Sequence, residues 1–325
     1  RDTDRSRGLG DVYKRQDCLR LGANGESSFV ALQFYYAMTI LKIFAEYKKD
    51  TEYVQYLEET QKAFGEKVQE LCWDNDRFVR GYTESGERIG EAAAPEANMW
   101  LNPQSWAVIS GLASPEQGDA ALNNVYERLN TKYGAILMDP PYHAHAFDGA
   151  LAVIYNQGTK ENSGIFSQSQ GWLILAEALR GHGERAFTYF MENSPAAQND
   201  CAEIRRLEPY CYGQFTEGKA SKHFGRSHVH WLTGTASTVM VGCVEGILGL
   251  RPDLEGLRLS PSVPKSWKHF EIEKVFRGKQ LHISVENPDE KESGCCSLVL
   301  NGQKLADNYI PENLLQDKNE VILTL

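Results

Sequence analysis

Residues 28–48 read SFVALQFYYAMTILKIFAEYK, and this stretch decides the class of fold. Its apolar residues recur at spacings of three and four, at Phe29, Leu32, Tyr36, Ile40 and Ile43 or Phe44. That period places one apolar stripe along an α-helix, so we predict a helix over 28–48. Asp50 can cap a second helix, because apolar residues continue with the same period from Val54 to Leu71.

The helical pattern continues to about Gly249. The run SPEQ at 114–117 combines a capping serine, a proline at the first helical position and a glutamine three residues after the cap. Further helical runs cover 172–179 and 186–191. Residues 235–248 are apolar on nearly every side, which predicts an interior helix.

After Pro252 the apolar residues alternate with period two, as they do in β-strands. Strands are predicted around 257–259, 270–275, 281–285 and 320–325, and Asn301-Gly302 predicts a hairpin. The fold class is therefore mainly α, with a helical domain over 17–250 followed by a small antiparallel β domain over 251–325.

Composition narrows the functional class of the protein. A net charge of −10 and a pI near 5.4 argue against a nucleic-acid or anionic-membrane partner. No apolar run approaches the roughly 20 residues of a membrane helix, and the start of the sequence lacks the apolar core of a signal peptide. Seven cysteines without metal-ligand spacing predict reduced thiols in a cytoplasmic protein.

Residues 1–16 read RDTDRSRGLGDVYKRQ, which is dense in charge and nearly free of apolar side chains. Nothing in this segment can join a core, and it looks like translated adapter sequence. We therefore expect a non-native segment over 1–16, with Asp17 as the first authentic residue.

Three long connections between helices, at 77–103, 139–164 and 195–231, are rich in aromatic residues and histidines. Loops of this length in a compact domain are usually functional. Flat aromatic faces beside hydrogen-bonding groups suit sugar rings. Such side chains occur at Trp100, Tyr142, His143, His145, Tyr155, Tyr210, Tyr212, His228 and His230.

The run WLTGT at 231–235 stands directly before the apolar helix. A Thr-Gly-Thr turn at a helix N-terminus offers backbone N–H groups and hydroxyls, and the helix dipole favours an anion there. A threonine that merely caps the helix is the alternative. The runs KENSGIF at 160–166 and EPYCYGQ at 208–214 indicate by themselves only a capping segment and a rigid loop.

Several runs together resemble the cellobiose and cellodextrin phosphorylases of glycoside hydrolase family ninety-four. The resemblance covers residues 17 to about 275 and is carried, in order, by LNPQSWAVISG at 101–111, KEN at 160–162, GIF at 164–166, QGW at 170–172, EPY at 208–210, Gln214, WLTGTA at 231–236, ILGLRPD at 247–253 and PKSW at 264–267. It implies that residues 17–250 form part of an (α/α)6 barrel and that residues 251–325 form a C-terminal β-sandwich-like domain. We expect the family's N-terminal sandwich and first barrel helices to be missing from this sequence.

The resemblance also implies the catalytic acid. Asp17-Cys18-Leu19 matches the end of the family motif Asp-Trp-Asn-Asp-Cys-Leu, whose second aspartate is the general acid. Arg15 and Gln16 depart from that motif, which fits a foreign splice at this point.

Further site residues follow from the same resemblance. Gln214, Thr233 and Gly234 match phosphate-binding positions, and Tyr155 and Lys160, with the adjoining Glu161, match the saccharide site. Gln168 stands at a phosphate-binding position where the family has a histidine, so it adds no charge. Leu151 replaces an acceptor-site glutamate, which makes strict specificity for cellobiose less expected.

The predicted reaction is inverting phosphorolysis of a β-linked glucosyl disaccharide or oligosaccharide to α-glucose 1-phosphate and a shortened saccharide. Phosphate is already anionic, so one acid suffices where an inverting hydrolase needs two carboxylates. Inorganic phosphate is the co-substrate, and no metal or organic cofactor is expected. The family forms homodimers, and an isolated fragment is expected to be inactive. Glycosidic linkage and acceptor stay open.

Two alternatives remain at this point. An inverting hydrolase on the same barrel would use a second carboxylate, for which Glu161, Glu203 and Glu208 are candidates. A non-catalytic saccharide-binding protein would bind sugar without turnover.

Overall fold

The computed structural model describes residues 21, 24–143 and 155–325. Contacts divide the chain into two compact units. The first comprises Arg1–Ser169 and Pro195–Thr233, as far as these residues are described, and the second comprises Gln170–Ser194 and Gly234–Leu325.

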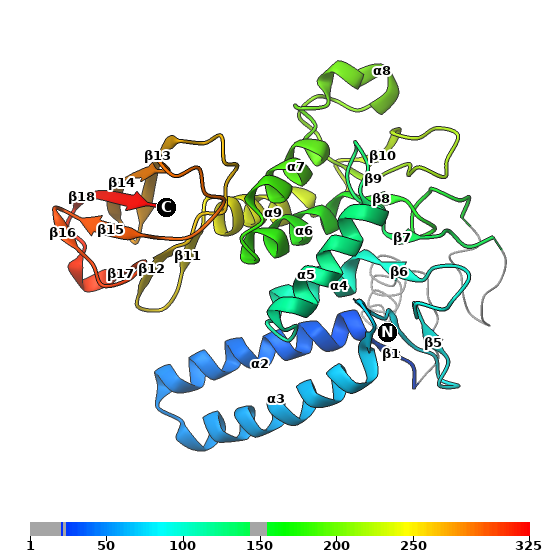
Figure 1. Ribbon diagram of the computed structural model, residues 1–325, viewed down its shortest axis with the longest axis horizontal. Coiled ribbons are helices and arrows are strands. Elements are labelled where there is room, and N and C mark those ends of the chain that lie inside the picture. The colour runs from blue at the N-terminus through cyan, green and yellow to red at the C-terminus, as the bar shows by residue number, and fades with distance from the viewer. Residues whose placement is uncertain (1–20, 22–23, 144–154) are drawn as a thin grey trace, which may run out of the picture. The chain divides into compact units, whose positions relative to one another are not determined.

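The first unit begins with two long helices, α2 and α3. Helix α2 covers Ser28–Lys48, the range predicted from its period, and α3 covers Thr51–Cys72. Asp50 caps α3 as predicted, because its Oδ1 accepts a hydrogen bond of 3.1 Å from the backbone N–H of Tyr53. Lys49 adopts a left-handed conformation with φ 58°, which turns the chain so that the two helices run side by side (Figure 1).

The buried face of α2 differs from the predicted stripe. Leu32, Met38 and Ala45 are buried, whereas Ile43 and Phe44 are 39% and 52% exposed. The prediction failed because α2 is apolar on most sides, so the period alone does not select the face that meets the core. Further exposed apolar side chains on this helix are Val30, Phe34, Leu41 and Tyr47.

Helix α2 also corrects the expectation about membrane-length segments. It contains an 18-residue window with a mean hydropathy of 1.4, so by length and composition it could cross a membrane. The core helix of a soluble protein meets the same criteria. The prediction missed this segment because tyrosine, threonine and alanine interrupt its strongly apolar residues without adding charge.

Helices α4 and α5 of this unit cover Leu101–Ile109 and Pro115–Asn124, and a π-helical turn, η1, continues α5 over Val125–Leu129. The capping box at Ser114 and Gln117 is confirmed, with both reciprocal hydrogen bonds present. Leu32, Val68 and Ala107 from α2, α3 and α4 meet in one core cluster, together with Phe78 and Val79.

Short strands connect these helices. They are β1 (Glu26–Ser27), β2 (Trp73–Asp74), β3 (Arg77–Phe78), β4 (Gly81–Tyr82), β5 (Arg88–Ile89), β6 (Met99–Trp100) and β7 (Met138–Asp139). Three further strands, β8 (Ile165–Phe166), β9 (Gly213–Thr216) and β10 (Ser227–His230), form one antiparallel sheet in the order β10-β9-β8. A short helix, α8 (Ala202–Arg205), follows the 3-10 turn η3 (Asn199–Cys201).

The second unit contains helix α7 (Gly183–Asn193), helix α9 (Thr235–Val241) with its π-helical continuation η4 (Gly242–Ile247), and most of α6 (Ser167–Leu179). Thr235 and Val239 are buried, but Met240 is 66% exposed. The prediction of a fully interior helix over 235–248 is therefore wrong for one face, because an apolar surface alone does not guarantee a covering neighbour.

The C-terminal strands form two sheets. Strands β11 (Leu250–Pro252), β12 (Gly256–Leu259) and β17 (Tyr309–Pro311) are antiparallel, and the 3-10 turn η5 (Glu312–Leu314) follows β17. The larger sheet has the order β13-β14-β18-β15-β16. Its strands are β13 (His269–Phe276), β14 (Lys279–Glu286), β15 (Ser297–Leu300), β16 (Gln303–Lys304) and β18 (Lys318–Thr324).

The hairpin at Asn301-Gly302 is confirmed between β15 and β16, with both turn residues at positive φ. The prediction of a purely antiparallel domain is wrong, however, because β14 and β18 pair in parallel. Period-two alternation identifies a strand and its buried face, but carries no information about the direction of its partner.

The C-terminal strands begin at Leu250, close to the change of sequence pattern after Pro252. The two compact units, however, divide at other positions. Helix α7 belongs with the strands: the backbone N–H of Glu184 donates to Glu292, and a Glu184 carboxylate oxygen accepts from the backbone N–H of Lys265. The predicted domain limits and the barrel therefore stay predictions.

Candidate functional site

The sheet β10-β9-β8 brings together three of the predicted phosphate-binding residues. Both strand pairs are antiparallel, so the ends of β8 and β10 lie at the same edge as the start of β9. Gln168 follows β8 by two residues, Gln214 is the second residue of β9, and Thr233 follows β10 by three. We call this edge the anion edge. The side chain of Gln168 is exposed, and Gln214 and Thr233 are half-buried, so solutes can reach these polar groups.

The turn at Thr233 leads directly into α9. Gly234 is the N-cap residue of this helix, and no side chain caps it. The simpler alternative, a threonine that serves as the helix cap, is therefore wrong. Gly234 is exposed. The dipole of a helix favours an anion at its N-terminal end.

The backbone near the anion edge holds bulky residues in an unfavourable conformation. Val229 and Trp231 have φ of 55° and 66°, in the left-handed region that β-branched and aromatic residues rarely adopt. Such strain persists only where the surrounding structure enforces it, and it concentrates at functional sites. Here it flanks His230, the last residue of β10.

The predicted saccharide-site residues Tyr155 and Lys160 lie together. The Nζ atom of Lys160 is 5.3 Å from the centroid of the Tyr155 ring, a cation–π contact that orients both side chains. Lys160 has a φ of 45°, and Glu161 is half-buried beside it. Three predicted or related positions, Asp17, His145 and Leu151, lie outside the described residues.

Asn162 holds this loop in place and was not singled out from the sequence. Its buried side chain accepts a hydrogen bond of 2.8 Å from the Tyr142 N–H and donates to the carbonyl oxygens of Tyr142 and Tyr155, at 3.0 Å each. It therefore fixes two of the aromatic residues that the sequence assigned to sugar binding. The motif KEN contained the signal, but only the fold reveals which backbone groups the amide reaches.

Glu217 and His228 form a second polar pair beside the sheet. Glu217 is buried, and its Oε1 lies 2.7 Å from Nε2 of His228, whose ring stacks on Phe215 at 4.8 Å between centroids. Ser221 donates a hydrogen bond to the other carboxylate oxygen. Burial by itself raises the pKa of Glu217, but the hydrogen bonds from Ser221 and His228 and the charges of His228 and His223 together lower the pKa below its usual value.

The lowered pKa of Glu217 predicts a loss of stability in acid. A carboxylate whose pKa is depressed by folding contributes stability above its unfolded pKa, and this contribution disappears as the pH falls through the folded pKa. Between pH 6 and pH 3, the urea midpoint of the wild type should fall more steeply than that of Glu217→Gln. Parallel curves for the two proteins would contradict the assignment.

Glu208 and His230 form a third pair at the anion edge, with 3.2 Å between Oε2 and Nδ1. Of the three carboxylates considered for a hydrolase, Glu208 thus lies on the loop that enters β9, and Glu203 is exposed on α8. Within the described residues, no cluster of three or more His, Cys, Asp or Glu side chains could hold a metal ion.

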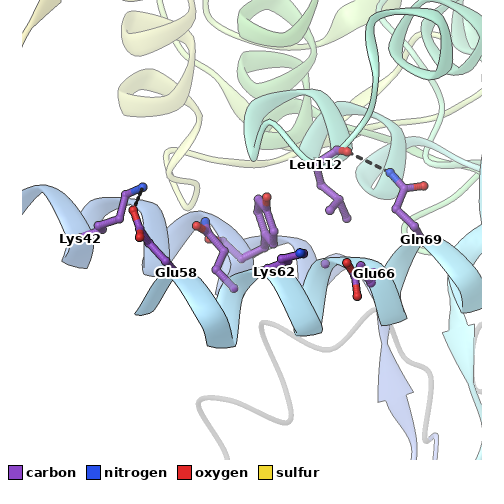
Figure 2. A pocket seen from close by; sticks show the side chains of 9 residues that line it. Lys42, Glu58, Lys62, Glu66, Gln69 and Leu112 are labelled. Carbon is purple, nitrogen blue, oxygen red and sulfur yellow. Dashed lines mark hydrogen bonds and ion pairs between the residues drawn. The ribbon is translucent and has the colours of Figure 1, made fainter. Parts of the chain in front are cut away.

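A groove of about 590 Å³ lies between α2, α3 and the loop after α4 (Figure 2). Its walls carry an ion pair of 3.3 Å between Lys42 and Glu58, and Gln69 donates to the Leu112 carbonyl at 2.8 Å. None of the predicted site residues that the structure describes lines this groove. The charged side chains of this groove lie on exposed helix faces. The volume of the groove is therefore not a sufficient reason to place the reaction there.

Comparison with known families places the chain in a class of carbohydrate-active enzymes. Residues 9–249 match the catalytic domain of the glycosyl hydrolase 94 superfamily, and the chain belongs to this family. The match begins inside the segment 1–16 that the sequence marked as foreign. The family predicted from the motifs is thereby confirmed.

This chain matches each of the following relatives over only part of the relative's length. The N,N'-diacetylchitobiose phosphorylase of Vibrio proteolyticus is 35% identical over 95% of this chain and 39% of that protein. The solabiose phosphorylase of Paenibacillus borealis is 26% identical over 93% of this chain and 40% of that protein. This chain thus spans about two fifths of the length of either relative. A solved sialidase structure matches 96% of this chain and 28% of its own, with a TM-score of 0.60 and 13% identity, which is a likeness of fold alone.

Proposed function

We propose that a polypeptide of family length containing this chain catalyses inverting phosphorolysis of a β-linked glucosyl disaccharide or oligosaccharide, with α-glucose 1-phosphate and a shortened saccharide as products. One observation carries the proposal: Gln168 and Thr233 follow strands that end at one sheet edge, and Gln214 lies in the strand that begins there. The phosphorylase activities named for the relatives support the same reaction class.

In the proposed reaction, phosphate binds at the anion edge and its oxygen attacks the anomeric carbon. The new C–O bond forms as the glycosidic bond breaks on the opposite face, which inverts the configuration. Asp17 donates its proton to the departing sugar oxygen. Gln214, Thr233 and Gly234 orient the phosphate, and the neutral side chain of Gln168 contributes hydrogen bonds without charge.

The acceptor sugar is proposed to contact Tyr155, Lys160 and Glu161. The fixed contact between Lys160 and the Tyr155 ring presents a cation and an aromatic face together. Such a site suits a ring with one apolar face and a polar rim. We further propose action in the cytoplasm, as a homodimer, with inorganic phosphate as co-substrate and without a metal or organic cofactor. The 325-residue chain alone is proposed to be inactive.

The deciding experiment runs the reaction in the synthetic direction. A polypeptide of family length is incubated with α-glucose 1-phosphate or α-N-acetylglucosamine 1-phosphate and a panel of sugar acceptors, and phosphate release is measured. The amino-sugar donor is included because two relatives are named for diacetylchitobiose. Release with the glucosyl donor supports the proposal, and release with the amino-sugar donor alone would keep phosphorolysis but replace the sugar.

An inverting hydrolase is the second candidate, favoured by the position of Glu208 beside the anion edge. It would release free sugar from the disaccharide in phosphate-free buffer. A phosphorylase would leave the disaccharide intact under those conditions, so one assay separates the two.

A further inference from the structure

Two large aromatic side chains lie exposed side by side at the anion edge. Tyr210 is 72% exposed and Trp231 is 65% exposed, and their ring centroids are 5.8 Å apart at an interplanar angle of 50°. They come from different segments, since Tyr210 precedes β9 by three residues and Trp231 directly follows β10. The Trp231 N–H donates to the Tyr212 carbonyl at 3.2 Å, which ties the two segments together.

An exposed aromatic pair needs an explanation, because aromatic rings gain more than most side chains from leaving water. Trp231 is held outward although its backbone occupies the left-handed region at φ 66°. A relaxed extended backbone at this position would point the indole in another direction. The fold therefore maintains an unfavourable conformation in which the ring stays exposed beside Tyr210.

The pair has polar neighbours on both of its segments. Glu208 precedes Tyr210 by two residues and His230 directly precedes Trp231, and Glu208 Oε2 lies 3.2 Å from His230 Nδ1. An apolar face with a carboxylate and an imidazole on neighbouring residues of the same two segments suits a pyranose ring, whose C–H face is apolar and whose hydroxyls form hydrogen bonds at its rim.

We propose that Tyr210 and Trp231 form a platform on which a sugar ring of the saccharide substrate stacks, with Glu208 and His230 binding its hydroxyl groups. This inference rests on the proposed function. The platform is continuous with the candidate site, because Gln214 follows Tyr210 by four residues and Thr233 follows Trp231 by two. It binds saccharide and makes no contact with phosphate.

The test uses a polypeptide of family length and the variants Trp231→Ala, Trp231→Phe and Tyr210→Ala. Loss of the stacking face should raise the KM for saccharide roughly five- to tenfold in the alanine variants, while the KM for phosphate stays within about twofold. Trp231→Phe should retain most of the affinity because it keeps an aromatic face. Tyr47→Ala, at an equally exposed tyrosine near the end of α2, is the matched control.

Several results would overturn the platform. Unchanged saccharide KM in both alanine variants would do so, as would equal rises in the KM for saccharide and for phosphate. If one alanine variant lowers the melting temperature, the other alanine variant and Trp231→Phe decide the question. Loss of self-association in Trp231→Ala, with unchanged saccharide KM, would assign the surface to a second copy of the chain instead.

A direct binding measurement separates failure of the platform from failure of the proposed function. Cellobiose and diacetylchitobiose are titrated into the 325-residue chain while tryptophan fluorescence is followed. Quenching that disappears in Trp231→Phe, combined with an absence of phosphorolysis in the polypeptide of family length, would reject the phosphorylase and retain the platform. Phosphorolysis by the polypeptide of family length, together with quenching that persists in Trp231→Phe, would retain the phosphorylase and reject the platform.

Discussion

Replacement of Asp17 by asparagine should lower kcat for phosphorolysis by about 10²- to 10⁴-fold in a polypeptide of family length, with little change in the KM for phosphate. Phosphate needs no activating base, so the proposed mechanism has a single proton donor. Asparagine keeps the size of the side chain but cannot protonate the leaving oxygen. Initial rates of sugar phosphate formation measure the effect.

The leaving group provides an internal control for this prediction. An aryl glycoside with an acidic phenol departs without a proton, so the same variant should lose far less activity on that substrate. Glu203→Gln, at an exposed carboxylate on α8, should keep wild-type phosphorolysis. Substantial turnover of a natural disaccharide by Asp17→Asn would show that another residue is the acid.

Asn162→Leu should lower the free energy of unfolding of the 325-residue chain by about 3 kcal/mol or more. Leucine has a similar size, but it removes the hydrogen bonds of the Asn162 side chain to three backbone groups, the Tyr142 N–H and the carbonyls of Tyr142 and Tyr155. Each buried polar group without a partner costs about 1–3 kcal/mol. Urea unfolding followed by circular dichroism gives the difference.

Two variants sharpen this prediction. Asn162→Asp keeps the acceptor for the Tyr142 N–H and loses the two donated bonds, so its stability should fall between leucine and wild type. Asn156→Leu changes an exposed asparagine of the same loop and should shift the urea midpoint little. If both leucine variants unfold at the same urea concentration, Asn162 does not hold the loop.

Local signals in the sequence predicted local structure well. The range of α2, the Asp50 cap, the capping box at Ser114 and the hairpin at Asn301-Gly302 all depend on residues within a few positions of one another. Interactions at that range act in the isolated segment as well as in the fold, so their residue patterns suffice.

Features that depend on distant residues could not be predicted in this way. The buried face of α2 is chosen by partners such as Val68 and Ala107. The parallel pairing of β14 with β18 joins strands that are separated in the sequence by β15, β16 and β17. The roles of Asn162 and Glu217 were missed for the same reason, because each acts on groups that only the fold brings close.

The candidate site lies between these two cases. Motifs identified Gln214 and Thr233, and Tyr155 with Lys160, but gave no reason for their proximity. The antiparallel register of β8, β9 and β10 supplies that reason for the anion edge, and the cation–π contact supplies it for the saccharide loop.

The placement of β18 has a consequence for the order of assembly during synthesis. This strand is made after β13 to β16, yet it lies between β14 and β15. The two earlier hairpins therefore emerge from the ribosome with facing strand edges unpaired, and they can join only when residues 318–324 are available to bridge them. A polypeptide truncated before Lys318 should yield two separate hairpins prone to intermolecular pairing.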